Sequence, residues 1–74
     1  MITTVTEALA AGFSITLDCV PKRMEIDGIR DYHFRYIWEA EASKHKLGNT
    51  NWEGFATAEE CVTDMLIEIN KVIA

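Results

Sequence analysis

The sequence lacks most of the features that mark secreted, membrane-spanning and disordered chains. No apolar run approaches the roughly 20 residues that a membrane-spanning helix needs. The first seven residues contain neither a basic cluster nor an apolar segment, so no secretory signal is expected. A single proline, four glycines and no low-complexity tract leave no candidate linker. The sequence therefore predicts one domain over residues 1–74, located in the cytoplasm.

Cysteine is also scarce, with only Cys19 and Cys61 in the chain. The two lie far apart, with no C-x-x-C motif and no histidine at metal-binding spacing. A small secreted domain of this size usually carries more cysteines. Because free cysteines tend to be buried, both are expected to be buried free thiols, with a disulfide or a functional thiol as the alternatives.

Positive charge is in short supply, because seven Lys and Arg face twelve Asp and Glu, for a net charge of −5. This balance argues against a general nucleic-acid binder and against binding to an anionic membrane. It is compatible with a basic protein partner.

Motifs that carry chemistry are missing as well. There is no glycine-rich phosphate loop, no G-x-S-x-G and no H-E-x-x-H. His33 lies beside Arg35 and Glu39 on a polar strand face, without the pocket and partner that a general base requires. The sequence therefore predicts no enzyme, no cofactor and no metal site.

What the sequence does contain begins with a short helix over residues 4–12. Thr4 and Glu7 have the spacing of a capping box, and Gly12 is a natural helix stop. The helix is too short to be stable alone, so its apolar side must pack on a larger layer.

A β-hairpin is predicted next. From Phe13 to Val20 apolar and polar residues alternate, as in a half-buried strand. Pro21 then marks a strand end, an edge or a bulge. Asp27-Gly28 favours a two-residue type I′ turn, and a second strand runs from about Asp31 to Ala42. The apolar side of that strand comprises Tyr32, Phe34, Tyr36, Trp38, Ala40 and Ala42.

The last third of the chain predicts a loop, a short strand and a long helix. Residues 43–51 are polar and turn-rich, which is typical of a loop. Trp52–Phe55 is a candidate third strand. Thr57 and Glu60 form a second capping box, and apolar residues then recur every three or four positions to the C-terminus.

These elements predict a small α+β domain of order α-β-β-(β)-α. An antiparallel sheet of about three strands would carry the long C-terminal helix and the short N-terminal helix on one face. The expected core comprises Val5, Leu9, Phe13, Ile15, Leu17, Phe34, Tyr36, Trp38, Val62, Met65, Leu66, Ile69 and Ile73.

Two acidic groups are candidate partner-binding residues. Glu60, Asp64 and Glu68 recur every four residues, so they form one row on the last helix. Like charges one turn apart repel, and a tolerated row of this kind favours docking against a basic groove. Glu39 and Glu41 belong to the outer face of the sheet. Ile37 is the apolar exception on that face and a candidate contact for a partner or for a second copy.

Two families share features with this chain. The α-β-β-β-α order is similar to that of double-stranded-RNA-binding domains, but Thr57-Ala58-Glu59-Glu60 stands where those domains place lysines. The resemblance is therefore one of topology. In its size, acidity and lack of catalytic motifs the chain resembles the small phage proteins that block bacterial defence systems, the anti-CRISPR inhibitors. This resemblance implies a compact, non-enzymatic inhibitor acting in the host cytoplasm.

The leading hypothesis from the sequence is a non-enzymatic protein–protein interaction module. Its expected partner is a basic, nucleic-acid-binding complex that a phage or prophage inhibitor would block through its acidic surface. One alternative is a small nucleic-acid-binding domain that uses its basic segments, Lys22-Arg23 and Lys44 to Lys46. The other alternative is a homodimeric accessory protein built around Ile37.

Overall fold

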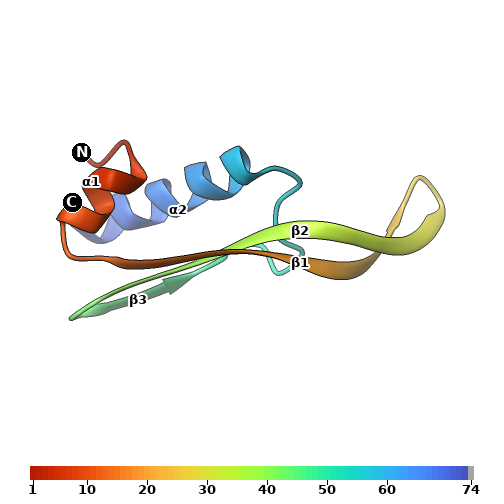
Figure 1. Ribbon diagram of the computed structural model, residues 1–74, viewed down its shortest axis with the longest axis horizontal. Helices are drawn as coiled ribbons and strands as arrows, with labels where there is room; N and C mark the ends of the chain where they lie inside the picture. Colours follow the sequence, from red (N-terminus) through yellow and green to blue (C-terminus); the bar gives the residue numbers. More distant parts are fainter. Residues whose placement is uncertain (74) are drawn as a thin grey trace.

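The computed structural model describes residues 1–73, and these fold into one α+β unit. Its elements are α1 (Val5–Ala10), β1 (Ser14–Ile26), β2 (Ile29–Ala42), β3 (His45–Gly48) and α2 (Ala58–Ile73). The strands form one antiparallel sheet in the order β1-β2-β3, and both helices lie on the same face of it (Figure 1). The predicted fold class is confirmed. The predicted extension of the last helix to Ala74 lies outside the described residues.

Both helices begin where the capping residues predict. At α1, the Glu7 N–H donates to the Thr4 hydroxyl oxygen at 3.1 Å. At α2, the Glu60 N–H donates to the Thr57 hydroxyl oxygen at 3.2 Å. These bonds satisfy N–H groups that the first turn of a helix leaves without a backbone partner.

The hairpin of β1 and β2 is the longest feature of the molecule. Its pairing runs without interruption from Ser14 opposite Glu41 to Ile26 opposite Ile29. The turn is the predicted type I′, because Asp27 has a φ of 54° and Gly28 a φ of 77°.

Pro21 lies inside β1 without ending it, and the sheet order explains why. On the neighbouring strand, Tyr36 directs its N–H and C=O to Phe55, away from β1. Phe34 has the same parity as Tyr36, so it and Pro21 opposite form a pair without mutual backbone hydrogen bonds. The missing N–H of Pro21 therefore faces the free edge of the sheet, where it removes no hydrogen bond.

The third strand is not where the sequence predicts it. Residues 45–48, expected to be loop, form β3, and the Ser43-Lys44 turn connects them to β2. The sequence does not predict this strand because Leu47 is the one large apolar residue in a segment otherwise dominated by charge. Leu47 nevertheless packs against the core. The expected strand at Trp52–Phe55 reduces to a single bridge between Phe55 and Tyr36.

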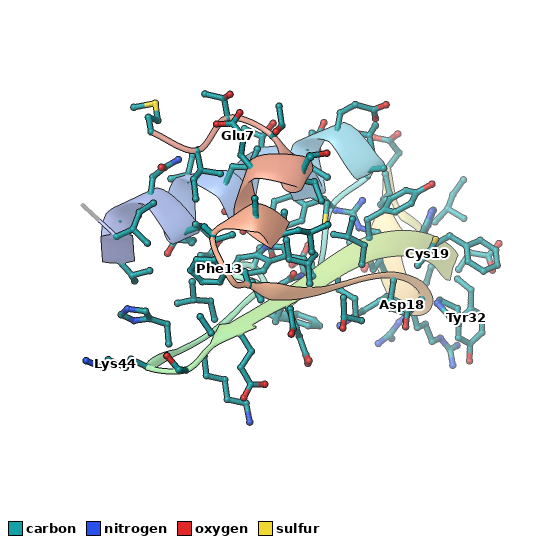
Figure 2. The ribbon with its side chains drawn as sticks, turned by 60° about the vertical axis from the view of Figure 1, so that its left-hand side comes forward. Glu7, Phe13, Asp18, Cys19, Tyr32 and Lys44 are labelled. Carbon is teal, nitrogen blue, oxygen red and sulfur yellow. The ribbon has the colours of Figure 1, made fainter. Side chains whose placement is uncertain are left out.

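The core lies between the two helices and the end of the hairpin formed by the start of β1 and the end of β2. Trp38 is only 1% exposed, and its indole N–H donates to Asp64 at 2.8 Å. Phe13 lies beneath α1, where the chain enters the sheet (Figure 2). The buried apolar residues are Ile2, Ala8, Phe13, Trp38, Ala40, Cys61, Met65 and Ile69. Phe13, Trp38, Met65 and Ile69 are thus confirmed as core.

Four residues predicted as core are exposed, namely Leu9, Leu17, Phe34 and Ile73. Leu9 is on the solvent side of α1, and Ile73 ends α2. Phe34 has the predicted orientation, but the helical layer is too short to reach it. Leu17 faces the same side directly opposite the buried Trp38, but α2 packs mainly on β2 and β3 and leaves β1 uncovered there. A helix of 16 residues spans about 24 Å, whereas a strand of 13 residues spans about 43 Å. The molecule is accordingly elongated, at 42 × 19 × 17 Å.

The part of the hairpin beyond the helical layer is here called the arm, residues 20–35, and the rest of the chain the body. Cys19, predicted to be buried, lies exposed at the base of the arm, while Cys61 is buried as predicted. Both thiols are free.

Candidate functional site

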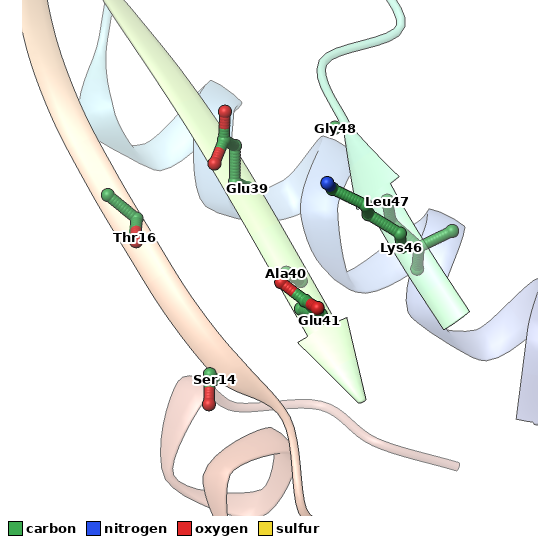
Figure 3. A pocket seen from close by; sticks show the side chains of 8 residues that line it. All are labelled: Ser14, Thr16, Glu39, Ala40, Glu41, Lys46, Leu47 and Gly48. Carbon is green, nitrogen blue, oxygen red and sulfur yellow. The ribbon is translucent and has the colours of Figure 1, made fainter. Parts of the chain in front are cut away.

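The outer face of the sheet, opposite the helices, carries a groove at its body end. Its volume is about 310 Å³, and it is lined by Ser14, Thr16, Glu39, Ala40, Glu41, Lys46, Leu47 and Gly48 (Figure 3). The register places Ser14 opposite Glu41 and Thr16 opposite Glu39. Two carboxylates, two hydroxyls and the Lys46 ammonium therefore border one groove. The carboxylates and hydroxyls accept hydrogen bonds from ammonium and guanidinium groups.

The carboxylates of Glu39 and Glu41 are available to bind a cationic group. Both are exposed, and within residues 1–73 the sole ion pair joins Lys71 to Glu68. Their Cα atoms are two strand positions apart, about 7 Å. Lys46 lies opposite Glu41 on β3 and forms no salt bridge with it within residues 1–73. The prediction that these two side chains point outward is confirmed.

The acidic row of the last helix is largely occupied by contacts within the chain. Asp64 accepts hydrogen bonds from the Trp38 indole at 2.8 Å and from the Thr50 hydroxyl at 2.9 Å. Glu68 contacts the Lys71 ammonium at 2.7 Å, and this hydrogen bond raises the pKa of Lys71. Only Glu60 of the row is exposed, whereas Asp64 and Glu68 are half-buried. Because α2 covers the inner face of the sheet, the row and the Glu39–Glu41 pair do not form one surface.

A loop that the sequence does not reveal crosses the outer face at the base of the arm. This crossing loop, residues 51–54, accepts hydrogen bonds through its carbonyls. Arg35 donates to Glu53 O at 3.1 Å and to Gly54 O at 3.0 Å. Lys22 donates to Trp52 O at 2.6 Å, with its ammonium 5.5 Å from the centre of the Trp52 ring.

The crossing loop also determines the environment of Ile37, which is half-buried. An added Cβ on Gly54 would lie 3.3 Å from the Ile37 Cγ2, so backbone and side chain are closely packed there. Ile37 is therefore less available to a partner than a residue on an open sheet face. It remains at the margin of the outer face, next to Glu39.

His33 is half-buried on the same face, with Lys22 as its cross-strand neighbour. Its Nε2 is enclosed and has no hydrogen-bond partner among residues 1–73. In the same part of the chain, no three His, Cys, Asp or Glu side chains gather closely enough to hold a metal ion.

The inner face of the arm is the surface that sequence analysis missed. Phe34 is 72% exposed and Tyr32 65% exposed, although both share the face that buries Trp38. Pro21 lies opposite Phe34, and Cys19 opposite Tyr36. Cys19 and Tyr32 project from the hairpin beyond the helices (Figure 2). The signal that reveals this surface is the difference in length between the hairpin and the last helix.

No protein-family model, curated protein or solved structure matches this chain. Within residues 1–73, no helix combines the length and the apolar content needed to cross a membrane.

Proposed function

We propose that the chain is a non-enzymatic protein-binding module that presents the acidic outer face of its body to a basic partner. The observation that carries this proposal is the groove bordered by Glu39 and Glu41, whose carboxylates have no cationic partner within residues 1–73. A lysine or arginine of a partner would complete the missing ion pairs, with the hydroxyls of Ser14 and Thr16 as further acceptors.

The distribution of charge supports the same proposal. The arm carries four basic and three acidic side chains, a net charge of +1. The body carries three basic and nine acidic side chains, a net charge of −6. A basic partner is therefore drawn to the body, and its association is accelerated most at low ionic strength.

In its more specific form, the proposal makes the chain an inhibitor of a nucleic-acid-binding complex. Lysine and arginine side chains that bind phosphates can form hydrogen bonds of the same geometry with carboxylates. The backbone of Glu39 and Glu41 is fixed on the central strand of the sheet, so only their side chains lose freedom on binding. The format shared with the anti-CRISPR inhibitors, a small acidic chain without catalytic motifs, is compatible with this role.

Direct nucleic-acid binding is the weaker alternative on geometric grounds. Lys22 and Arg23 belong to the arm, whereas Lys44 and Lys46 lie at the β2–β3 turn. The nine strand positions between His33 and Ala42, which pair with Lys22 and His45, separate the two groups by about 30 Å. Lys22 is moreover held by the crossing loop. The basic residues thus do not converge on one phosphate-binding patch.

The proposal is tested by titrating an arginine-rich peptide into matched charge-reversal variants. E39K/E41K and E59K/E60K change the net charge equally, but only the first alters the outer face. Binding by the wild type should weaken with salt, and E39K/E41K should bind at least about tenfold more weakly than E59K/E60K. Circular dichroism checks that both variants are folded. Equal losses in the two variants would reduce the effect to net charge and reject the groove as the binding site.

A further inference from the structure

The part of β1 that belongs to the body is an outer strand with an unpaired backbone edge. The Trp38 N–H donates to the Asn49 side chain at 2.7 Å, on the side of β2 away from β1. Leu17, which lies opposite Trp38, therefore directs its N–H and C=O groups to the free edge, and Ile15 does the same by alternation. This part of β1, residues 14–18, is here called the open edge.

The open edge is short and has defined ends. Towards α1, the Phe13 N–H is already bonded to the Ala8 carbonyl oxygen at 3.2 Å. Towards the arm, the Cys19 N–H is bonded to the Asp18 carboxylate at 2.8 Å, and Pro21 has no N–H. Strand edges with unpaired N–H and C=O groups are templates for a further strand, so the groups between these two ends are available for pairing.

The two faces beside the open edge differ in chemistry. On the outer face, Ser14 and Thr16 stand between the edge and the two carboxylates of the groove, and both side chains are short (Figure 3). On the inner face, Leu17 is 48% exposed because α2 packs mainly on β2 and β3. A strand added here would therefore meet carboxylates on one face and an apolar side chain on the other.

We infer that the open edge binds an extended segment of the basic partner as a fourth, antiparallel strand. The side chains of that segment on the outer face would be lysine or arginine, and the alternate side chains would be apolar. In this mode of recognition the main-chain hydrogen bonds supply affinity and the alternate side chains supply specificity. The inference rests on the proposed function, because the carboxylates of the groove receive the cations, and it adds the form of the partner segment.

The spacing of the strands allows the cations to reach the groove. Neighbouring strands lie about 4.8 Å apart, so an added strand would lie roughly 10 Å from β2. A lysine or arginine side chain and the facing Glu39 or Glu41 side chain can together span that gap. The methylene stem of the cationic residue would lie over Ser14 and Thr16.

Charge distinguishes the open edge from the other free edges and selects a basic occupant. The edge of β1 is unpaired again at Arg23 and Glu25, but Lys22 and Arg23 would repel a basic segment there. β3 is the other outer strand, and it carries Lys46. A second copy of this chain paired through the same edge would bring two sets of carboxylates together, which is unfavourable.

Backbone methylation of a model peptide tests the pairing. The probe is a short peptide of alternating lysine and valine, titrated by calorimetry. In the antiparallel pair, the valine N–H groups face the open edge and the lysine N–H groups face away from it. N-methylation of the valines should therefore weaken binding at least about tenfold relative to N-methylation of the same number of lysines. Equal binding by the two methylated peptides overturns the inference, as does a wild type that does not bind the unmethylated peptide.

Leu17→Pro and Leu17→Ala are matched variants of the protein. Proline removes the edge N–H without removing a ladder hydrogen bond, as Pro21 does in the same strand, whereas alanine keeps the N–H. L17P should bind the alternating peptide at least about tenfold more weakly than L17A, with circular dichroism to check that both are folded. Equal affinities reject the open edge. If L17P does not fold, the methylated peptides decide the question.

Amide hydrogen exchange locates the bound peptide. Binding should slow exchange at Ile15 and Leu17 and leave Thr16 unchanged, because the Thr16 N–H already belongs to the ladder with β2. Slower exchange confined to other residues places the peptide elsewhere and overturns the inference.

The charge-reversal variants separate failure of this inference from failure of the proposed function. A selective loss of peptide binding in E39K/E41K, without discrimination between the methylated peptides, rejects the open edge and retains the groove. Discrimination between the methylated peptides, with equal losses in E39K/E41K and E59K/E60K, rejects the groove and retains strand pairing at the open edge.

Discussion

The body and the arm use one hairpin in two different ways. Along β2 the same alternation of side chains runs from Tyr32 to Ala42, yet Trp38 and Ala40 are buried and Tyr32 and Phe34 are exposed. The difference lies entirely in what packs on the strand: α1 and α2 cover the body end, and nothing in the described chain covers the arm. An apolar face thus stabilises the domain at one end and is exposed at the other.

The clearest way to test this comparison is to truncate one aromatic residue in each region. Trp38→Ala should reduce the free energy of unfolding by about 3–5 kcal/mol, because it removes a fully buried side chain and the hydrogen bond to Asp64. That is a large share of the stability of so small a domain. Phe34→Ala should cost less than about 1 kcal/mol, because the side chain is 72% exposed. Urea unfolding of both variants measures the two costs.

Trp38→Phe serves as the intermediate variant, because it keeps one aromatic ring in the core while removing the indole donor and the rest of the indole. Its cost, about 1–3 kcal/mol, combines the loss of the donor to Asp64 with the small cavity that is left. If Phe34→Ala destabilised the domain as much as Trp38→Ala, the distinction between body and arm would be lost.

Sequence periodicity identified the faces of the hairpin but not their coverage. The period of two placed Trp38 inward and Glu39 and Glu41 outward, and capping residues located both helix starts, because these signals are local. Coverage depends on the lengths of the strands and helices and on which strands α2 packs against. Extending the core to Phe34 was wrong because β2 runs past the helical layer. Including Leu17 was wrong because α2 packs mainly on β2 and β3, which leaves β1 uncovered.

A second prediction concerns the crossing loop, which joins the body to the base of the arm. Gly54 has a φ of 74°, and an added Cβ would meet the Tyr36 carbonyl oxygen at 2.9 Å. Gly54→Ala should therefore lower stability by about 2–4 kcal/mol through backbone strain and the clash together. Gly28→Ala is the matched control, because Gly28 has a φ of 77° with open space around it, and strain alone should cost about 1–2 kcal/mol.

Thermal unfolding of the two glycine variants separates strain from contact. Equal losses of stability in the two variants would show that the close approach of the crossing loop to β2 adds nothing to the cost of Gly54→Ala. Hydrogen exchange of the amides near Arg35 should also quicken in Gly54→Ala, because Arg35 is the residue that holds the loop carbonyls.

The candidate site was predictable only where it depended on local patterns. The outward direction of Glu39 and Glu41 follows from strand alternation. The occupation of Asp64 by Trp38 and Thr50 does not, because it joins three segments that are distant in the sequence. The same holds for the crossing loop, where Arg35 and Lys22 donate to carbonyls that any residue type would supply. Contacts to backbone oxygens leave no signature in the sequence.

The smallest expected effect lies at the start of α1, at the end of the body farthest from the arm. Hydrogen bonds from the hydroxyls of Thr3 and then Thr4 lower the pKa of Glu7 below its ordinary value of 4.5. A carboxyl whose pKa is lower in the folded state adds stability above its unfolded pKa, and that stability is lost as the pH falls through the folded pKa.

Thr3→Val should therefore raise the pKa of Glu7 in an NMR titration and slightly reduce stability at neutral pH, with the difference from the wild type vanishing in acid. Thr6→Val, an exposed neighbour that makes no hydrogen bond to Glu7 within residues 1–73, is the control and should leave the titration unchanged. Because α1 packs on α2 and not on the arm, the amide exchange rates of residues 20–35 should be the same in both variants. A change there would mean that the arm and the end of the body are coupled, contrary to the division between the two regions.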